Sequence, residues 1–166
     1  MITPEREANR SAISGRDCNT AMEYLDAYLE LQKKDEKSGT SEFFTHCEGL
    51  LIAAIVAYSR AFTESRSEPF ATPQLRVNLG KVFSKDHSKI TLHNLILNKR
   101  NKAIAHSDWE YHKSELLEAT KEKGVLRKHS VVRYGERIDI GLFRNIAEIM
   151  STHFSSETYD RDVSAK

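Results

Sequence analysis

The sequence predicts an all-α protein: a bundle of four or more helices, with a small β-hairpin or an irregular insertion before the last helix. Three observations lead to this prediction. Apolar residues recur at helical spacing in four separate stretches, polar breaks divide these stretches, and a further stretch around Gly135 alternates between apolar and polar residues. With 166 residues, of which 39% are hydrophobic and 30% charged, the chain is long enough for a single domain, residues 1–166, around one core.

A first helix is predicted over residues 17–37, with Asp17 as its N-cap. Residues 1–15 are mostly polar, and we expect them to be frayed or partly helical. The break at 38–41 contains Gly39, a residue type that suits the end of a helix. The apolar residues of this helix share one side, which consists of Ala21, Met22, Leu25, Tyr28 and Leu29.

A second helix is predicted over residues 42–63. Its middle, residues 49–58, is apolar almost all round, so we expect this helix to be the central and most buried one. Residues 64–85 contain two prolines and are predicted to form a long connection, with a short helix around 75–83.

A third helix is predicted at about residues 86–105, with Ser84 or Asp86 as its N-cap. At about 100° of rotation per residue, its apolar residues cover a broad arc that also contains Arg100, next to His93. A half-buried arginine is costly without an anion, so we expect a carboxylate, a phosphate or a second subunit beside it. The arc consists of Leu92, Leu95, Ile96, Leu97, Ala103 and Ile104, and the opposite side carries Asn94, Asn98 and Asn101.

Residues 107–138 are predicted to be an insertion between this helix and the last one. Residues 131–140 alternate loosely around Gly135, which favours a β-hairpin there. Residues 115–123 fit either a helix or the first strand of that hairpin.

A last helix is predicted over residues 141–154, with Asp139 as its N-cap. The polar residues 156–166 that follow it are expected to be frayed. The inward-facing side of this helix is predicted to consist of Leu142, Phe143, Ile146, Ile149 and Met150.

The net charge of +1 argues against a protein that coats nucleic acid by bulk electrostatics. The charge is unevenly distributed, however. From Lys99 to Arg137, ten Lys and Arg residues stand against six Asp and Glu residues, a local charge of +4. This asymmetry fits a phosphate-binding surface and equally fits ordinary scatter over a solvated face.

Two cysteines, Cys18 and Cys47, are too few for a disulfide framework or a cysteine-rich metal site, which favours a reducing compartment. The first residues are charged and lack the apolar centre of a secretory signal. The longest apolar run, residues 50–58, is too short to cross a bilayer. We therefore expect a cytoplasmic protein without a membrane partner.

The segment Arg100–His106 has an arginine, an asparagine directly after it, and a histidine after five intervening residues. This segment resembles the signature of the HEPN superfamily, in which an Arg, often followed by Asn, precedes a His by a few residues. The resemblance implies an all-helical homodimer and a metal-independent endoribonuclease of a toxin–antitoxin or phage-defence system. The superfamily also includes members that bind or scaffold, so a non-catalytic module for dimerisation and partner binding is the alternative.

These residue types suit RNA cleavage. His106 can act as acid or base while a 2′-hydroxyl attacks the phosphate and the 5′-oxygen leaves. Arg100 can hold the phosphate and offset its growing charge, and Asn101 can orient His106 or the scissile group. Alternatively, Arg100 pairs with a core acid such as Glu48, and His106 caps a carbonyl at the helix end. Arg60 can add a charge to this cleft or form a surface salt bridge.

Further RNA contacts are predicted for Lys99, Lys102, Trp109 and Tyr111, although the two aromatic residues can instead pin a loop against the helices. No metal is expected, because the histidines and acids of residues 106–112 lie on a loop without a fixed face. No cofactor motif is present. The expected partners are RNA, a second copy of the chain, and an antitoxin or nucleotidyltransferase-like protein, as the resemblance implies.

Overall fold

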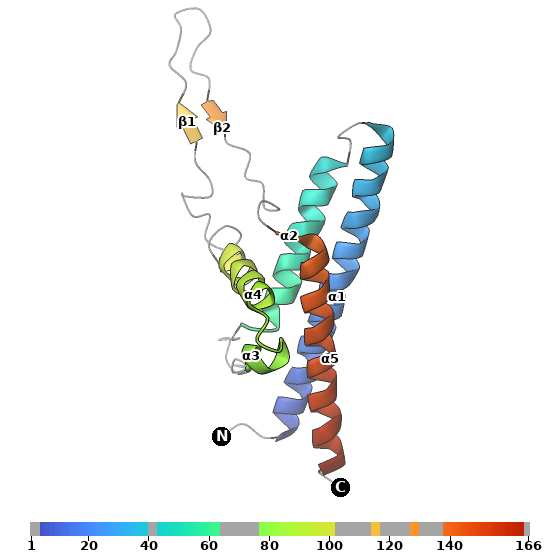
Figure 1. Cartoon of the computed structure of the whole chain (residues 1–166), viewed down its shortest axis with the longest axis vertical. Coiled ribbons are helices and arrows are strands. Elements are labelled where there is room, and N and C mark those ends of the chain that lie inside the picture. Colours follow the sequence, from blue (N-terminus) through green and yellow to red (C-terminus); the bar gives the residue numbers. More distant parts are fainter. Residues whose placement is uncertain are drawn as a thin grey trace, which may run out of the picture.

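The computed structural model of the chain describes residues 4–39, 43–63, 77–101, 114–116, 127–129 and 138–164. These residues form five helices and two short strands (Figure 1). The elements are α1 (Pro4–Ser38), α2 (Phe44–Arg60), α3 (Leu79–Val82), α4 (His87–Lys99), β1 (Ser114–Leu116), β2 (Arg127–His129) and α5 (Ile140–Ser164).

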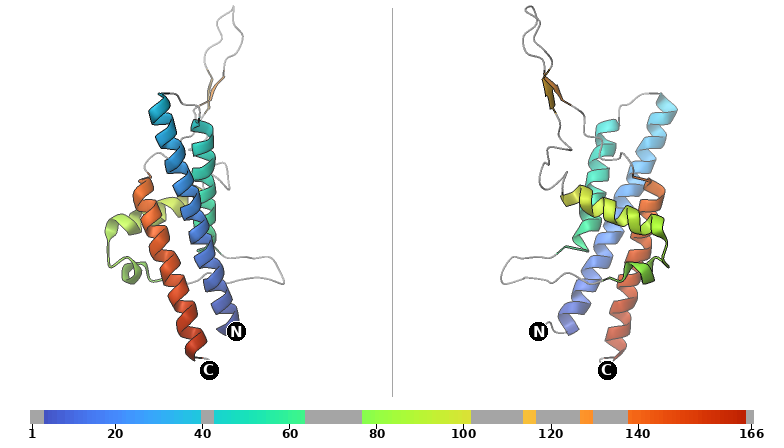
Figure 2. Two further views of the ribbon diagram at one scale, coloured as in Figure 1. Left: turned by 90° about the vertical axis from the view of Figure 1, so that its right-hand side faces the viewer. Right: turned by 60° about the vertical axis from the view of Figure 1, so that its left-hand side comes forward.

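Three long helices make up the body of the molecule. Helices α1, α2 and α5 run side by side, and α4 crosses them at a steep angle (Figures 1 and 2). The backbone of α1 lies against both α2 and α5, and α4 contacts the same two helices. The described residues therefore form the helical bundle that the sequence predicted. Among them, no helix combines the length and the apolar character that a membrane span requires.

Helix α2 is strongly buried, as its apolar centre predicted, with seven of its 17 residues buried, and α1 is the helix that packs along both other long helices. One side of α2 packs on α1, whereas Ile52 and Val56 on its other side are half-buried and Gly49 is exposed. Helix α1 can pack on two neighbours because it is 35 residues long, and Gly15 lies where it faces α5. A β-carbon at Gly15 would lie 3.6 Å from Cβ of Phe154.

Helix α1 begins at Pro4, much earlier than the predicted start at Asp17. Proline suits the first helical position because its missing N–H would have no partner there, and Glu5 and Glu7 in the first turn favour the positive end of the helix dipole. Asp17 is therefore not an N-cap. It lies within the helix and forms an ion pair with Arg60 of α2, at 2.8 Å between Oδ1 and Nη2.

The turn from α1 to α2 follows the prediction at Gly39, which has a positive φ of 66°. Its N–H donates to the carbonyl oxygen of Asp35, and the carboxylate of Asp35 accepts from the N–H of Phe43 at the start of α2. At the other end of α2, the guanidinium of Arg10 donates to the carbonyl oxygens of Arg60 and Thr63. Side chains of α1 thus satisfy backbone groups at both ends of α2.

The caps predicted for the later helices are confirmed at two positions. Asp86 accepts from the N–H groups of Ser88 and Lys89 at the start of α4, so Asp86 rather than Ser84 is its N-cap. Asp139 accepts from the N–H of Leu142 in the first turn of α5. Helix α3 lies within the range expected for a short helix. Helix α5 continues to Ser164, so the predicted end at residue 154 is too early and residues 156–164, expected to be frayed, are helical.

Between α4 and α5, the structure describes two antiparallel strands of three residues each. Ser114 pairs with His129, Glu115 with Lys128, and Leu116 with Arg127. Residues 115 and 116 therefore lie in a strand, and the rest of the stretch 115–123, for which a helix or a strand was left open, lies outside the described residues. The alternating residues around Gly135 lie outside the described residues, so the hairpin predicted there stays a prediction.

Candidate functional site

Helix α4 presents the arginine of the RNA-cleavage hypothesis at its C-terminal end. The helical arc predicted from the sequence is confirmed over its described part. Leu92, His93 and Ile96 are buried against the bundle, and the three asparagines Asn94, Asn98 and Asn101 are exposed. Packing thus determines which side of α4 faces inward, and Arg100 follows the last residue of this helix.

Arg100 and Asn101 extend α4 by a wider, π-type turn. The N–H of Arg100 bonds to the carbonyl oxygens of Ile96 and Leu97, so its backbone position belongs to the helix. The side chain is half-buried, and Nη1 donates to Oδ1 of exposed Asn101 at 2.9 Å. The two neighbouring predicted site residues are therefore joined. Within the described part of the chain, the ion pair between Arg100 and Glu48 that we had kept open is not formed.

The other predicted site residues are placed less completely. Lys99 is buried, with 6% of its surface exposed, so an RNA contact by its ammonium group would require its side chain to move. Lys102, His106, Trp109 and Tyr111 lie outside the described residues. The relative arrangement of Arg100 and His106 therefore stays a prediction.

Arg60 forms a surface salt bridge, one of the two alternatives predicted for it. Its guanidinium pairs with Asp17 and is 54% exposed. Burial raises the pKa of Asp17, and the nearby charge of Arg60 works in the opposite direction. This pairing belongs to the contact between α1 and α2, so it does not add a free cation to the end of α4.

A buried histidine on α4 is the polar feature that sequence reasoning did not single out. Nδ1 of His93 lies 2.9 Å from the hydroxyl oxygen of Tyr58 on α2, and both side chains are buried. Their bond runs in either direction according to the histidine tautomer. Desolvation lowers the pKa of His93 from 6.5 to about 4, so the ring is neutral near pH 7. Burial also raises the pKa of Tyr58 well above 10, so its hydroxyl stays protonated.

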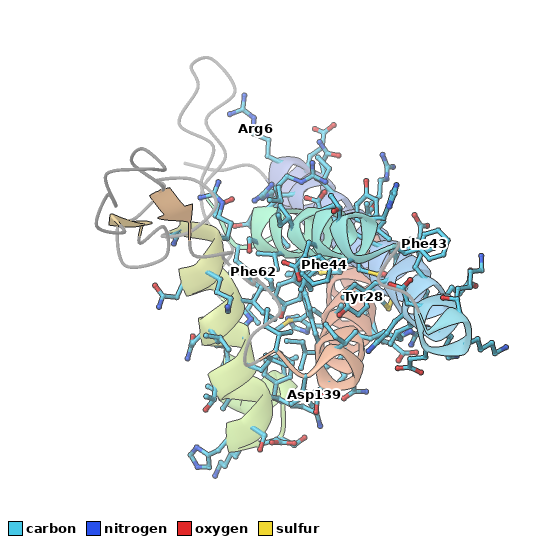
Figure 3. The ribbon with its side chains drawn as sticks, turned by 90° about the horizontal axis from the view of Figure 1, so that it is seen from above. Arg6, Tyr28, Phe43, Phe44, Phe62 and Asp139 are labelled. Carbon is cyan, nitrogen blue, oxygen red and sulfur yellow. The ribbon has the colours of Figure 1, made fainter. Side chains whose placement is uncertain are left out.

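Aromatic rings enclose this pair. The ring of Phe62 meets the His93 ring edge-on at 4.7 Å between centroids, and Phe83 lies at 6.2 Å. Tyr58 also contacts Phe143 of α5, at 5.4 Å. Figure 3 shows the side chains between α4 and the bundle, with Phe62 labelled where α2 faces α4. The sequence signal for this cluster was His93 itself, a polar residue inside the apolar arc.

Metal-binding residues are not clustered in the described part of the chain. No group of three or more His, Cys, Asp or Glu residues there could hold a metal ion. The two cysteines are buried free thiols, and desolvation raises the pKa of Cys18 to about 12. The residues 106–112, where the sequence predicts no metal, lie outside the described part of the chain.

Comparison with protein-family models, with curated proteins and with solved structures finds no match to this chain.

Proposed function

We propose that this protein is a HEPN-like, metal-independent endoribonuclease that acts on RNA as a homodimer in a toxin–antitoxin or phage-defence system. The observation that carries the proposal is the state of Arg100. Its guanidinium is half-buried at the end of a packed helix and bonds to the neutral amide of Asn101, and among the described residues it pairs with no carboxylate. A guanidinium has five N–H donors, so this bond leaves donors for a phosphate.

In the proposed reaction, a base removes the proton from a ribose 2′-hydroxyl, and the 2′-oxygen forms a bond to the adjacent phosphorus. The bond from phosphorus to the 5′-oxygen breaks, and an acid protonates that leaving oxygen. The products are a 2′,3′-cyclic phosphate and a 5′-hydroxyl. We assign the proton transfers to His106, the phosphate charge to Arg100, and the orientation of the reacting groups to Asn101.

One chain supplies a single His106 for two proton transfers. A two-fold dimer would bring two copies of the motif together, and one imidazole could then act as base while the other acts as acid. Lys102, Trp109 and Tyr111 are proposed to contact the RNA, the lysine through phosphate and the aromatic rings by stacking on unpaired bases. The proposed HEPN-like fold includes the hairpin around Gly135, and the proposed location is the cytoplasm.

A second candidate function is a non-catalytic module for dimerisation and partner binding. The observation that favours it is apolar surface on the bundle itself. Ile13 of α1 and Phe44 of α2 are each 40% exposed. Large exposed side chains of this kind are common in protein–protein contacts, although single exposed apolar residues also occur on ordinary surfaces.

The experiment that separates the two functions is an incubation of the purified protein with a mixed RNA pool in EDTA. The nuclease proposal expects cleavage, with cyclic phosphate at the 3′ ends and hydroxyl groups at the 5′ ends. Activity that disappears with the chelator would contradict the metal-independent reaction. Intact RNA from a folded, dimeric sample would instead favour the binding module.

A further inference from the structure

The hydrogen bond between Tyr58 and His93 joins α4 to α2 in the interior of the molecule. The hydroxyl oxygen and Nδ1 lie 2.9 Å apart, and the two side chains are 0% and 3% exposed. Neutral partners at this distance form a directional bond, and each needs the other because water has no access to them.

The groups around this bond are apolar rings. Phe62 lies in the turn that follows α2, and Phe83 in the turn between α3 and α4. Rings such as these fill space but accept many small rotations of a neighbouring helix. If α4 turned about its axis, the Tyr58 hydroxyl and the His93 ring nitrogen would lose their partners in an apolar environment. The hydrogen bond therefore opposes rotation in a way that aliphatic packing by Leu92 and Ile96 does not.

His93 and Arg100 are seven residues apart on this helix. Seven residues make about two turns, so Arg100 leaves the helix within roughly 20° of the direction of His93 and about 10 Å further along the axis. Arg100 keeps helical backbone angles, with φ −57° and ψ −48°, so the turn that holds it follows the rotation of α4. A rotation of α4 thus moves the ring of His93 and the backbone of Arg100 together.

We propose that Tyr58 and His93 are a positioning pair: their hydrogen bond sets the rotation of α4 and so the direction in which Arg100 is presented. The part of this proposal that concerns RNA cleavage rests on the proposed function, in which Arg100 holds the scissile phosphate. At the outer radius of a helix, about 5 Å, a rotation of roughly 20° would displace the arginine side chain by about 2 Å. A misplacement of about 1 Å can slow an enzyme by about 10²-fold.

The first test is the substitution Tyr58→Phe, which removes the hydroxyl and keeps the ring. The matched control is Tyr24→Phe on α1, where the tyrosine is 36% exposed and lies away from His93 in sequence and in the fold. We expect Tyr58→Phe to lower the single-turnover rate of RNA cleavage by about 10-fold to 100-fold at a temperature where it stays folded. RNA affinity should change less than this rate, and Tyr24→Phe should leave both unchanged.

The second test measures the direction of α4 without any RNA. Spin labels at Asn98→Cys on α4 and Arg16→Cys on α1, two exposed positions, report the distance between these helices by pulsed electron paramagnetic resonance. We expect Tyr58→Phe to shift or broaden the distance distribution by about 2 Å, and Tyr24→Phe to leave it unchanged. The native thiols are buried, and a sample without the introduced cysteines measures how much label they take up.

The two tests separate this inference from the proposed function. An unchanged distance distribution in folded Tyr58→Phe overturns the positioning pair, whatever the wild-type protein does to RNA. A shifted helix with full cleavage overturns it too. A wild-type protein that cleaves no RNA refutes the nuclease, and the distance measurement then decides the positioning of α4 alone. If Tyr58→Phe fails to fold, the double variant Tyr58→Phe/His93→Leu takes its place. This variant removes both partners of the hydrogen bond, so neither group is left unpaired. An unchanged distance distribution, or a shifted helix with full cleavage, would overturn the proposal in this variant too.

Discussion

At the scale of single residues, His93 shows how burial decides what a titratable group does. Desolvation is the cause of its low pKa, and the neighbouring titratable group, the hydroxyl of Tyr58, stays protonated throughout the acid range. The thiol of Cys18, which affects Tyr58 from α1, also stays protonated because its pKa is about 12. His93 is therefore the group of this cluster that responds to mild acid.

This residue predicts a pH dependence of stability. The folded-state pKa of His93, about 4, lies below its ordinary value of 6.5, so the unfolded chain takes up the proton first as the pH falls. The contribution to stability is complete above pH 6.5 and is lost as the pH falls from 6.5 towards 4, by at most about 3 kcal/mol. Urea unfolding between pH 4.5 and 7.5 measures it.

The control for that measurement is His93→Leu, which removes the titrating ring while carboxylates elsewhere titrate as before. The unfolding free energy of the wild-type protein minus that of His93→Leu should become smaller as the pH falls. A difference that stays constant across this range would contradict the prediction, because it would show that His93 has the same pKa in the folded and in the unfolded protein.

At the scale of helices and their ends, two arginines of similar chemistry have different predicted effects. Arg10 donates to two carbonyl oxygens at the end of α2, at 2.9 and 2.8 Å, and is half-buried. Arg60 makes an ion pair but is 54% exposed, so solvent screens it. We expect Arg10→Ala to lower the unfolding free energy by about 1–3 kcal/mol. Arg60→Ala should lower it by less than about 1 kcal/mol.

Urea denaturation of both variants under the same conditions measures the difference. An equal effect of the two substitutions would mean that the carbonyl groups at the end of α2 find other partners when Arg10 is removed. A larger effect of Arg60→Ala would mean that Asp17, which is 15% exposed at its side chain, depends on that ion pair more than its exposure suggests.

The helices themselves could be predicted where a local signal marks them. Asp86 and Asp139 precede helical patterns at the position where a side chain accepts backbone N–H groups, and Gly39 supplies the positive φ that ends α1. The start of α1 was misplaced because an aspartate inside a helix looks like an N-cap when its partner is unknown. The partner of Asp17 is Arg60, 43 positions away, and no local pattern reveals it.

At the scale of the whole molecule, the sequence predicted a bundle but not the order of its helices. Apolar content correctly indicated that α2 is strongly buried, whereas the packing of α1 along two distant helices has no local signal in the sequence. The same limit applies to the candidate site. The helical arc indicated that Arg100 lies beside buried residues, but the bond between Tyr58 and His93 links two helices 35 positions apart. Periodicity within one helix carries no information about such a bond.

The proposed dimer is a prediction for the intact chain. Sedimentation equilibrium at micromolar concentration should give twice the mass of the chain, 19.0 kDa. In the presence of RNA, we expect Arg100→Glu to shift this equilibrium towards the monomer, because two carboxylates near the two-fold axis would repel the phosphate that two arginines attract. Arg16→Glu, an exposed position on α1, is the control. A wild-type protein that sediments as a monomer would contradict the shared site.

Two substitutions test the proposed nuclease reaction: Arg100→Ala and His106→Ala. Their controls are Arg16→Ala and His87→Ala, at exposed positions. Single-turnover cleavage of a defined RNA in EDTA is the measurement. Loss of the proton-transferring imidazole should slow cleavage by about 10²-fold to 10⁴-fold with RNA affinity retained. Loss of Arg100 should slow it by about 10²-fold to 10³-fold and also weaken RNA binding. Both controls should cleave at the wild-type rate. Cleavage that persists unchanged in His106→Ala would contradict the proposed reaction.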